Sequence, residues 1–270
     1  MPSGEKSDRG AFLFGKQRRV LINRENFCDD AACEKYNEKS ENMIGIIGAM
    51  DVEVDALKKM MDGARVRKIS DVEFVSGKIH DKDVVAAVCS VGKVFAAIAA
   101  EAMILSYNPD VIINSGVAGA LSDKLGIADI VIADKVVQHD MNTTAFGDPR
   151  GLISGLNIVE IPCSERVVKG LKKAADESGL KNFSGVVASG DIFVDSRAAK
   201  DKIAKTFKAI ACEMEGASIG HVCYVNGVEF GVLRSISDSL TEESNMEYSE
   251  FVGIAAENSH KVIERFIKEF

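Results

Sequence analysis

The sequence lacks tryptophan, C-x-x-C cysteine pairs and histidines in H-x-x-x-H or H-E-x-x-H spacing. Four scattered histidines provide no recognisable ligand set, so no metal site is expected. Six cysteines without such pairing are typical of reduced thiols in the cytosol. No apolar run reaches the roughly 18 residues that a membrane-spanning helix needs, and the N-terminal region shows no sustained apolar stretch typical of a secretory signal. We therefore expect a cytoplasmic protein.

An excess of positive charge is also missing. The formal net charge is −8 and the isoelectric point is about 5.2, so neither nucleic acid nor an anionic membrane is an expected partner. Hydrophobic residues make up 46% of the chain and the mean hydropathy is +0.04. Together these values indicate a soluble globular protein with enough residues for one large core or two small ones.

Residues 1–42 differ in composition from the rest of the chain. They are polar and charged, and residues 20–22 form their only aliphatic cluster. This composition is typical of a poorly ordered tail or a short appended segment, and an upstream start site would also explain it. We interpret 1–42 as a polar N-terminal extension. Residues 43–270 are interpreted as a single domain, because no linker or internal repeat interrupts them.

From residue 43 onward, apolar runs of strand length alternate with helical patterns. Buried strands are expected at 43–48, 111–114, 130–137, 186–189, 209–212 and 227–233, with an antiparallel meander between 66 and 90. Helices are expected at 95–107, 164–178, 197–207, 216–224 and 248–270. The alternation predicts an α/β fold with three layers, α/β/α, around a central mixed, mainly parallel twisted sheet.

Acidic or small residues follow several of these strands, namely Glu53, the stretch 116–119, Glu213 with Glu215, and Asp238. The carboxyl ends of parallel strands share one edge of a sheet, where ligands bind. Carboxylates accept hydrogen bonds from sugar hydroxyls, and a pair of them can cleave a glycosidic bond as acid and base. Few cations accompany them, which argues against an anionic substrate. Two surface acids at a helix N-terminus explain the glutamates equally well.

Six short motifs stand in one order along the chain. They are 44–50 with Glu53, 115–119, 144–147, 189–191, 213–215 and 235–238. Together they closely resemble the bacterial 5′-methylthioadenosine/S-adenosylhomocysteine nucleosidases of the purine nucleoside phosphorylase-like superfamily. The resemblance runs from Met43 to the C-terminus. Each motif is weak alone, whereas six in order are specific.

The resemblance implies that Glu53 is the general base that activates water. Asp238, preceded by Ser237 as a further substrate contact, would be the general acid that protonates adenine at N7, which requires a desolvated position. Glu215 would bind the ribose hydroxyls, and Met214 would pack beneath the sugar. On composition alone, these acids fit helix and turn positions and the methionine fits a core position.

The same resemblance places Phe193 against the adenine face and the Val194 backbone at the adenine edge. Gly119 would be a loop glycine that contacts the ligand, Arg234 would help to hold the water, and Tyr248 would close over the 5′ end. The residues alone allow other interpretations: Phe193 could be a core residue, Gly119 could form a plain tight turn, and Arg234 could be solvated.

Phe146 and Thr143 fall where the family builds the alkylthio pocket from a neighbouring subunit, which implies a homodimer. Val117 departs from the pattern, because many relatives have serine there, near the water. The loop 148–151 also aligns poorly. Both departures bear on substrate preference and rate more than on reaction type. Glu213 is expected at the surface or as a supporting acid.

The leading hypothesis is hydrolysis of methylthioadenosine and adenosylhomocysteine to adenine and a thioribose, within methionine salvage. Water would be the nucleophile and no cofactor is expected. Three alternatives remain open: a phosphate-dependent nucleoside phosphorylase, a nucleosidase for futalosine-type nucleosides, and a non-catalytic nucleoside-binding relative. A shared fold alone does not decide among them.

Overall fold

The computed structural model describes residues 42–238 and 245–270, with the side chains of 245–250 also outside the description. The interpretation of 1–42 as an N-terminal extension therefore concerns residues that lie almost wholly outside the described ranges. The range Ser40–Phe270 forms one compact unit by its internal contacts. No helix in the described ranges combines the length and apolar character needed to cross a membrane.

Ten strands form the sheet in the described part of the chain. They are β1 (Ile44–Gly48), β2 (Asp62–Ile69), β3 (Val72–Ile79), β4 (Lys82–Val88), β5 (Val111–Ala120), β6 (Ile130–Gln138), β7 (Glu160–Pro162), β8 (Asn182–Ser189), β9 (Ala209–Glu213) and β10 (Glu229–Asp238). β1, β5 and β10 are almost entirely buried. Continuous apolar runs suit such strands because helices cover both faces of the sheet.

The sheet is mixed, as predicted, with a parallel centre. β1 pairs in parallel with β4 and β5, β5 with β10, and β8 with both β6 and β9. β2, β3 and β4 form the expected antiparallel meander. Two antiparallel pairings, β10 with β6 and β9 with β5, then close β5, β10, β6, β8 and β9 into a ring. The ring draws the ends of β5, β9 and β10 together.

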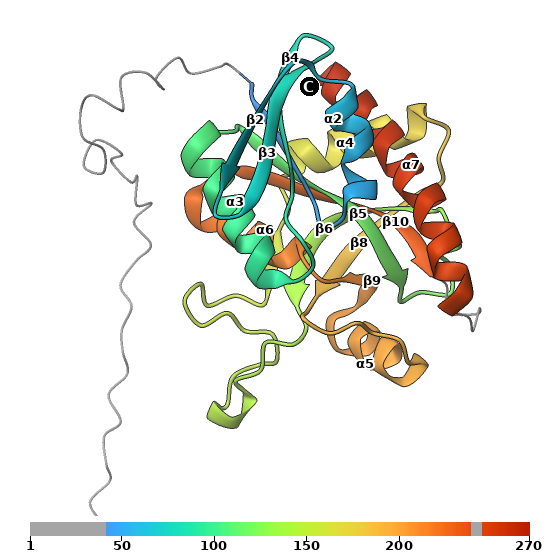
Figure 1. Cartoon of the computed structure of the whole chain (residues 1–270). Coiled ribbons are helices and arrows are strands. Elements are labelled where there is room, and N and C mark those ends of the chain that lie inside the picture. The colour runs from blue at the N-terminus through green and yellow to red at the C-terminus, as the bar shows by residue number, and fades with distance from the viewer. Residues whose placement is uncertain (1–41, 239–244) are drawn as a thin grey trace, which may run out of the picture. The chain divides into compact units, whose positions relative to one another are not determined.

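The helical segments are η3 (Asp51–Glu53), α2 (Asp55–Lys59), α3 (Lys93–Tyr107), η4 (Thr144–Phe146), α4 (Glu165–Glu177), α5 (Arg197–Phe207), α6 (Gly216–Asn226) and α7 (Asn245–Glu269). α3 and α6 pack together on one face of the sheet, and α4 and α7 pack on the other (Figure 1). α5 lies against β8 and β9. The three-layer α/β/α architecture is therefore confirmed.

One local prediction was wrong. The small-residue stretch 115–120 was expected to be a loop, but it continues β5, because each residue from Ser115 to Gly119 pairs with β10.

Ser164 stands at the N-cap position of α4, where its side chain makes no capping hydrogen bond. Its Oγ instead accepts a hydrogen bond from the Phe230 amide at 3.0 Å, which ties α4 to β10.

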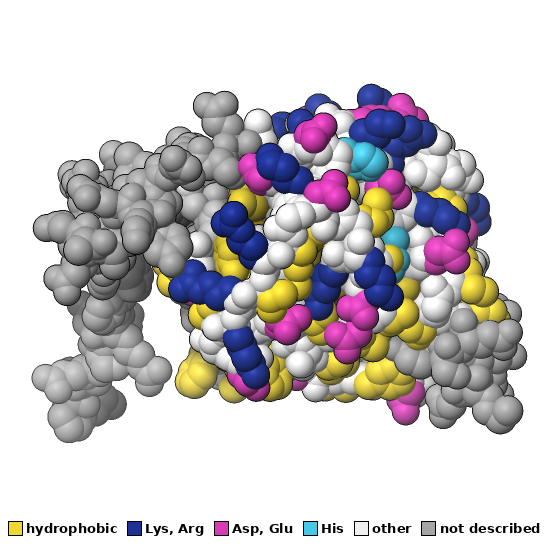
Figure 2. All heavy atoms as spheres, turned by 45° about the horizontal axis from the view of Figure 1, so that its top comes forward, with side chains coloured by type: hydrophobic (Ala, Val, Ile, Leu, Met, Phe, Trp, Pro, Cys, Tyr) yellow, Lys and Arg dark blue, Asp and Glu magenta, His cyan; other side chains and the backbone are white. Residues whose placement is uncertain are grey.

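Charged side chains on the face shown in Figure 2 are of both signs and interspersed. On β3 and β4, for example, Lys78 and Asp83 form an ion pair at 3.3 Å. Nothing on this face forms a continuous basic patch of the kind that would attract nucleic acid.

Candidate active site

A pocket opens where the carboxyl ends of β1, β5, β9 and β10 meet, with about 730 Å³ of space between atoms, part of it open to solvent. The predicted site residues that line it are Glu53, Gly119, Phe193, Val194, Met214, Glu215, Ser237 and Asp238. Residues far apart in the sequence thus face one cavity.

Glu53 is held by backbone amides at the end of β1. It is 2% exposed and sits on the 3-10 turn η3. Its Oε2 accepts hydrogen bonds from the amides of Ala49 at 2.7 Å and Met50 at 3.0 Å, and its Oε1 accepts one from Val117 at 3.0 Å. Val117, the departure from the family pattern, therefore still contributes its amide to the site. Two donors from the turn after β1 and one from β5 fix the carboxylate in one orientation.

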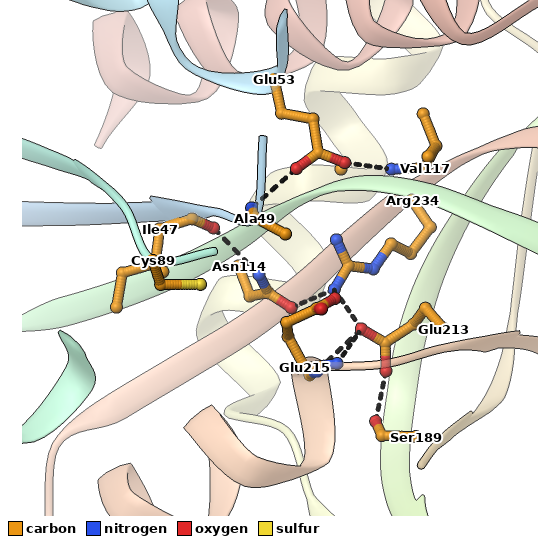
Figure 3. A network of polar contacts seen from close by, with 12 residues as sticks. Ile47, Ala49, Glu53, Cys89, Asn114, Val117, Ser189, Glu213, Glu215 and Arg234 are labelled. Atoms are coloured by element: carbon orange, nitrogen blue, oxygen red, sulfur yellow. Dashed lines mark hydrogen bonds and ion pairs between the residues drawn. The ribbon is translucent and has the colours of Figure 1, made fainter. Parts of the chain in front are cut away.

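Arg234 anchors a buried polar network behind the pocket (Figure 3). Its guanidinium, 1% exposed, donates to Glu213 and to Asn114, and lies 3.8 Å from Glu215 Oε2. Arg234 is therefore not solvated, and it does not line the cavity itself. A side chain at Gly116 would collide with both Arg234 Nη1 and Glu53 Oε1, so glycine there lets the two groups approach each other.

Glu213 is the hub of that network rather than a surface acid. It is 9% exposed. Its Oε2 accepts hydrogen bonds from the amides of Glu215 at 3.0 Å and Gly216 at 2.7 Å, besides the Arg234 guanidinium. Its Oε1 accepts one from the Ser189 hydroxyl at the end of β8. Glu213 was expected either at the surface or as a supporting acid, and these contacts agree with the supporting role.

Glu215 is buried with one carboxylate oxygen on a backbone amide. It is 5% exposed, and its Oε1 accepts a hydrogen bond from Gly92 at 2.8 Å. Burial, followed by repulsion from Glu213, raises the pKa of Glu215 to about 7, although the Arg234 guanidinium opposes the shift. A carboxyl group that titrates near neutrality can accept or donate hydrogen bonds to hydroxyl groups.

Asp238 ends β10 at the opposite side of the pocket. Its side chain is one-third exposed, and its Oδ2 accepts a hydrogen bond from Lys200 Nζ at 2.5 Å. A side chain at Gly119 would come within 2.8 Å of Asp238 Oδ1, so the glycine keeps that oxygen accessible. Gly119 was expected in a loop that contacts the ligand or in a plain tight turn, but it lies within β5.

The segment between β8 and α5 forms the outer side of the pocket. Phe193 is 61% exposed, so it is not a core phenylalanine, and Val194 is half-buried. Asp140 ties this segment to α3: it accepts hydrogen bonds from the Asp191 amide at 2.9 Å and from Lys93 Nζ at 2.7 Å. The Lys93 amide in turn donates to Asp191 Oδ1 at 2.7 Å.

Besides Arg234, Phe146 is a predicted site residue that does not line this pocket, and the prediction for Tyr248 falls outside the described side chains. Phe146, on η4, is 87% exposed and outside the cavity lining. Tyr248 belongs to the first turns of α7, whose side chains lie outside the described residues. Among the residues that the structure does describe, no group of three or more His, Cys, Asp or Glu side chains could hold a metal ion.

Sequence reasoning missed Lys200, Asn114 and Ser189. Asn114 ends the predicted strand 111–114 and Ser189 ends β8, which is the signal that singled out the acids, but neutral residues there were passed over. Lys200 carried a different signal. It shares the buried face of α5 with Ile203 and Phe207, at positions where an apolar residue would be expected.

Comparisons with known proteins agree with this geometry. The family model of the phosphorylase superfamily matches residues 43–268. A 5′-methylthioadenosine/S-adenosylhomocysteine nucleosidase of Shewanella halifaxensis is 37% identical over 84% of this chain and 99% of its own. The enzyme of that name from Staphylococcus aureus is 36% identical over 84% and 100%.

Solved structures give the same picture. The nucleosidase of Neisseria meningitidis, in complex with methylthio-immucillin-A, has a TM-score of 0.82 at 31% identity, covering 85% of this chain and 100% of that one. A futalosine hydrolase of Helicobacter pylori has a TM-score of 0.80 at 37% identity, covering 85% and 98%. The chain belongs to the phosphorylase superfamily and, within it, to the 5′-methylthioadenosine/S-adenosylhomocysteine nucleosidases.

Proposed function

We propose that this protein hydrolyses the N-glycosidic bond of 5′-methylthioadenosine and S-adenosylhomocysteine, releasing adenine and the corresponding 5-thioribose. The observation that carries the proposal is the meeting of Glu53, Glu215 and Asp238 in one pocket. Relatives that are 36–39% identical over most of the chain carry this activity in their names. Their substrates are therefore the first to test.

Glu53 is the proposed general base. Its carboxylate is fixed by three amides at one side of the pocket, with Arg234 close behind. In this position it takes a proton from a water molecule as the water oxygen bonds to C1′ of the ribose. The negative charge of Glu53 also stabilises the oxocarbenium-like character that C1′ acquires as its bond to N9 breaks.

Asp238 is the proposed general acid. Its accessible oxygen gives a proton to purine N7 while the electron pair of the C1′–N9 bond moves onto the purine ring. Glu215, with Met214 beside it, holds the ribose hydroxyls and thereby places C1′ between base and acid. One nucleoside and one water become adenine and the thioribose. Glu53 ends protonated and Asp238 deprotonated, and exchange with solvent restores both.

The lining of the pocket disfavours a phosphorylase. Among the described residues that line it, there is no lysine or arginine, and Glu53, Glu213, Glu215 and Asp238 supply negative charge. A phosphate nucleophile would need converging cations and would be repelled by these acids. The Arg234 guanidinium is already paired with Glu213. Water, a neutral nucleophile, meets no such barrier.

A futalosine-type nucleoside is the second candidate substrate, because a Helicobacter pylori futalosine hydrolase has 37% identity with this chain. The same base and acid would cleave its glycosidic bond. Discrimination between the two substrates falls on the 5′ side of the pocket. Tyr248, which the family resemblance assigns to that side, remains a proposed contact.

We further propose a homodimer in which Phe146 of one subunit completes the pocket of the other. The support is the exposure of large apolar side chains: Val91 and Ile192, which line the pocket, are 50% and 57% exposed, and Phe95 and Phe146 are 52% and 87% exposed. Burial of such side chains would favour association with a second subunit. We also propose a cytoplasmic role in methionine salvage, and a domain boundary at residue 43, where the family match begins.

A substrate panel in phosphate-free buffer tests the function. Purified protein should release adenine from methylthioadenosine and adenosylhomocysteine at full rate without phosphate. Turnover that requires added phosphate would assign a phosphorylase, and cleavage of futalosine alone would assign the second candidate. Binding without turnover of any substrate would indicate a nucleoside-binding protein.

Glu53→Gln tests the assigned base. Glutamine keeps the size of the side chain but cannot take a proton from water, so kcat should fall by roughly 10²- to 10⁴-fold. Asp51→Gln is the matched control, because that acid lies on the same turn and is exposed. Activity of Glu53→Gln within twofold of wild type would remove Glu53 from the mechanism.

A further inference from the structure

Lys200 is a buried lysine that contacts the proposed general acid. It is 6% exposed, and its Nζ lies 2.5 Å from Asp238 Oδ2. Among the described residues it is the one lysine whose side chain is buried. Lys202 and Lys205, on the same helix α5, are exposed as lysines usually are. The position of Lys200 therefore needs an explanation.

Stability of the fold does not supply that explanation. The buried face of α5 consists of Lys200, Ile203 and Phe207, so an aliphatic residue at 200 would continue it. Desolvating the ammonium offsets most of its attraction to the carboxylate, so the ion pair contributes little net stability. An apolar side chain at position 200 would pack on this face equally well, and the Asp238 carboxylate, one-third exposed, would keep contact with solvent.

The geometry suggests a role for the lysine in orienting Asp238. Lys200 Nζ donates a hydrogen bond to Oδ2, whereas Oδ1 is the oxygen nearer to Gly119, a residue of the pocket lining. The two oxygens are therefore distinguished before any ligand arrives, because only Oδ2 is bound to the lysine of α5. A carboxyl group held at one oxygen cannot rotate freely, which keeps the proton-donating oxygen aimed at the purine.

We propose that Lys200 is a positioning residue for Asp238, an inference that rests on the proposed hydrolysis. As the proton passes from Asp238 Oδ1 to purine N7 and the C1′–N9 electron pair moves onto the ring, negative charge returns to the carboxylate. The Lys200 ammonium stabilises that charge as it develops. Stabilisation that grows during the step lowers the barrier rather than strengthening substrate binding.

Lys200→Met tests this role. Methionine fills the buried site without charge, so we expect kcat for methylthioadenosine to fall about 10- to 100-fold, with KM changed less than about threefold. The melting temperature should change little, because the Asp238 side chain is one-third exposed and stays in contact with solvent when its cation is removed. Lys200→Arg, which keeps the charge, should recover part of the activity. Lys202→Met, an exposed change on the same helix, should leave kcat unchanged. Lys200→Gln replaces Lys200→Met if the latter is insoluble.

A second substrate separates proton donation from pocket shape. The 4-nitrophenyl glycoside of 5-methylthioribose has a leaving group that needs no proton, so Lys200→Met should cleave it within about threefold of the wild-type rate. If wild type does not cleave it, the test is made with the double variant Lys200→Met/Asp238→Asn. Its kcat for methylthioadenosine should be no lower than that of Asp238→Asn alone.

Two outcomes would overturn the inference. One is a kcat for methylthioadenosine in Lys200→Met that equals the wild-type value. The other is an equal loss on both substrates, or an additional loss in the Asp238→Asn background, since either means that Lys200 acts without Asp238. Failure of wild type itself to hydrolyse methylthioadenosine would instead count against the proposed function.

Discussion

The two sides of the pocket are built differently. The inner wall, taken together with the network behind it, is defined as Glu53, Asn114, Glu213, Glu215 and Arg234 and consists of polar side chains that are at most 9% exposed. The outer wall, defined as Ile192, Phe193 and Val194, includes two apolar side chains that are more than half exposed. Inner-wall residues stand on strands or on the turns that follow them, whereas the outer-wall residues come from the segment after β8.

This contrast separates the proposed chemistry from substrate selection. The fold itself orients the inner wall, because buried charges persist only where partners surround them. Its groups are therefore in place before a ligand arrives, as preorganised catalysis requires. The outer wall leaves apolar surface uncovered, so a ligand or a second subunit gains by covering it. We expect mutations of the inner wall to affect folding and kcat, and mutations of the outer wall to affect KM.

The strongest test of the inner wall is Arg234→Met. Removing the guanidinium leaves Glu213 and Glu215 buried without their cation, which should lower the free energy of unfolding by roughly 3–5 kcal/mol. Urea denaturation at neutral pH measures the change. Arg197→Met is the control, because Arg197 makes similar ion pairs with Asp123 and Asp201 at an exposed site. If Arg234→Met unfolded at the same urea concentration as wild type, the inner wall would not depend on this arginine.

Protonation of Glu215 gives a smaller effect with a defined sign. Its pKa is about 7 in the folded protein against a usual value of 4.5, so the folded state holds the extra proton between these values. Stability from this group is therefore present below about pH 4.5 and is lost as pH rises through 7. Relative to Glu215→Gln, wild type should lose on the order of 2 kcal/mol of unfolding free energy between pH 5 and pH 8.

Glu215→Gln suits this comparison because the glutamine oxygen can still accept the hydrogen bond from the Gly92 amide. Unfolding midpoints of both proteins in urea, measured at several pH values, give the difference directly. Glu257→Gln, at an exposed position on α7, should follow the wild-type curve. Parallel curves for wild type and Glu215→Gln would mean that Glu215 is ionised throughout this range in the folded state.

The sequence predicted the inner wall less completely than the strands that carry it. Apolar runs bounded by polar residues located β1, β5, β9 and β10, since strand length and composition are local properties. The acids at their ends could be found the same way. Their mutual contacts could not, because Arg234 reaches Asn114 and Glu213 only after β5, β9 and β10 come together. A solvated arginine was an equally fair reading of the sequence.

One further error and one omission have the same physical origin. Small residues from 115 to 120 look like a loop, because glycine and serine favour turns, yet pairing with β10 keeps them in a strand. Lys200 was not singled out, because only the approach of Asp238, 38 residues later, explains its burial. Local propensity is a weak guide wherever a distant partner supplies the compensating contact.

The outer wall makes the last and smallest prediction. Phe193→Ala removes an aromatic face from the proposed adenine site, and such contacts contribute about 0.5–1.5 kcal/mol, so KM for methylthioadenosine should rise roughly 2- to 12-fold. Because the ring is 61% exposed, the melting temperature should not change. Leu105→Ala, a similarly exposed apolar change on α3, should alter neither value. A fall in kcat at constant KM would place Phe193 with the inner wall, and the division between the two sides of the pocket would then fail.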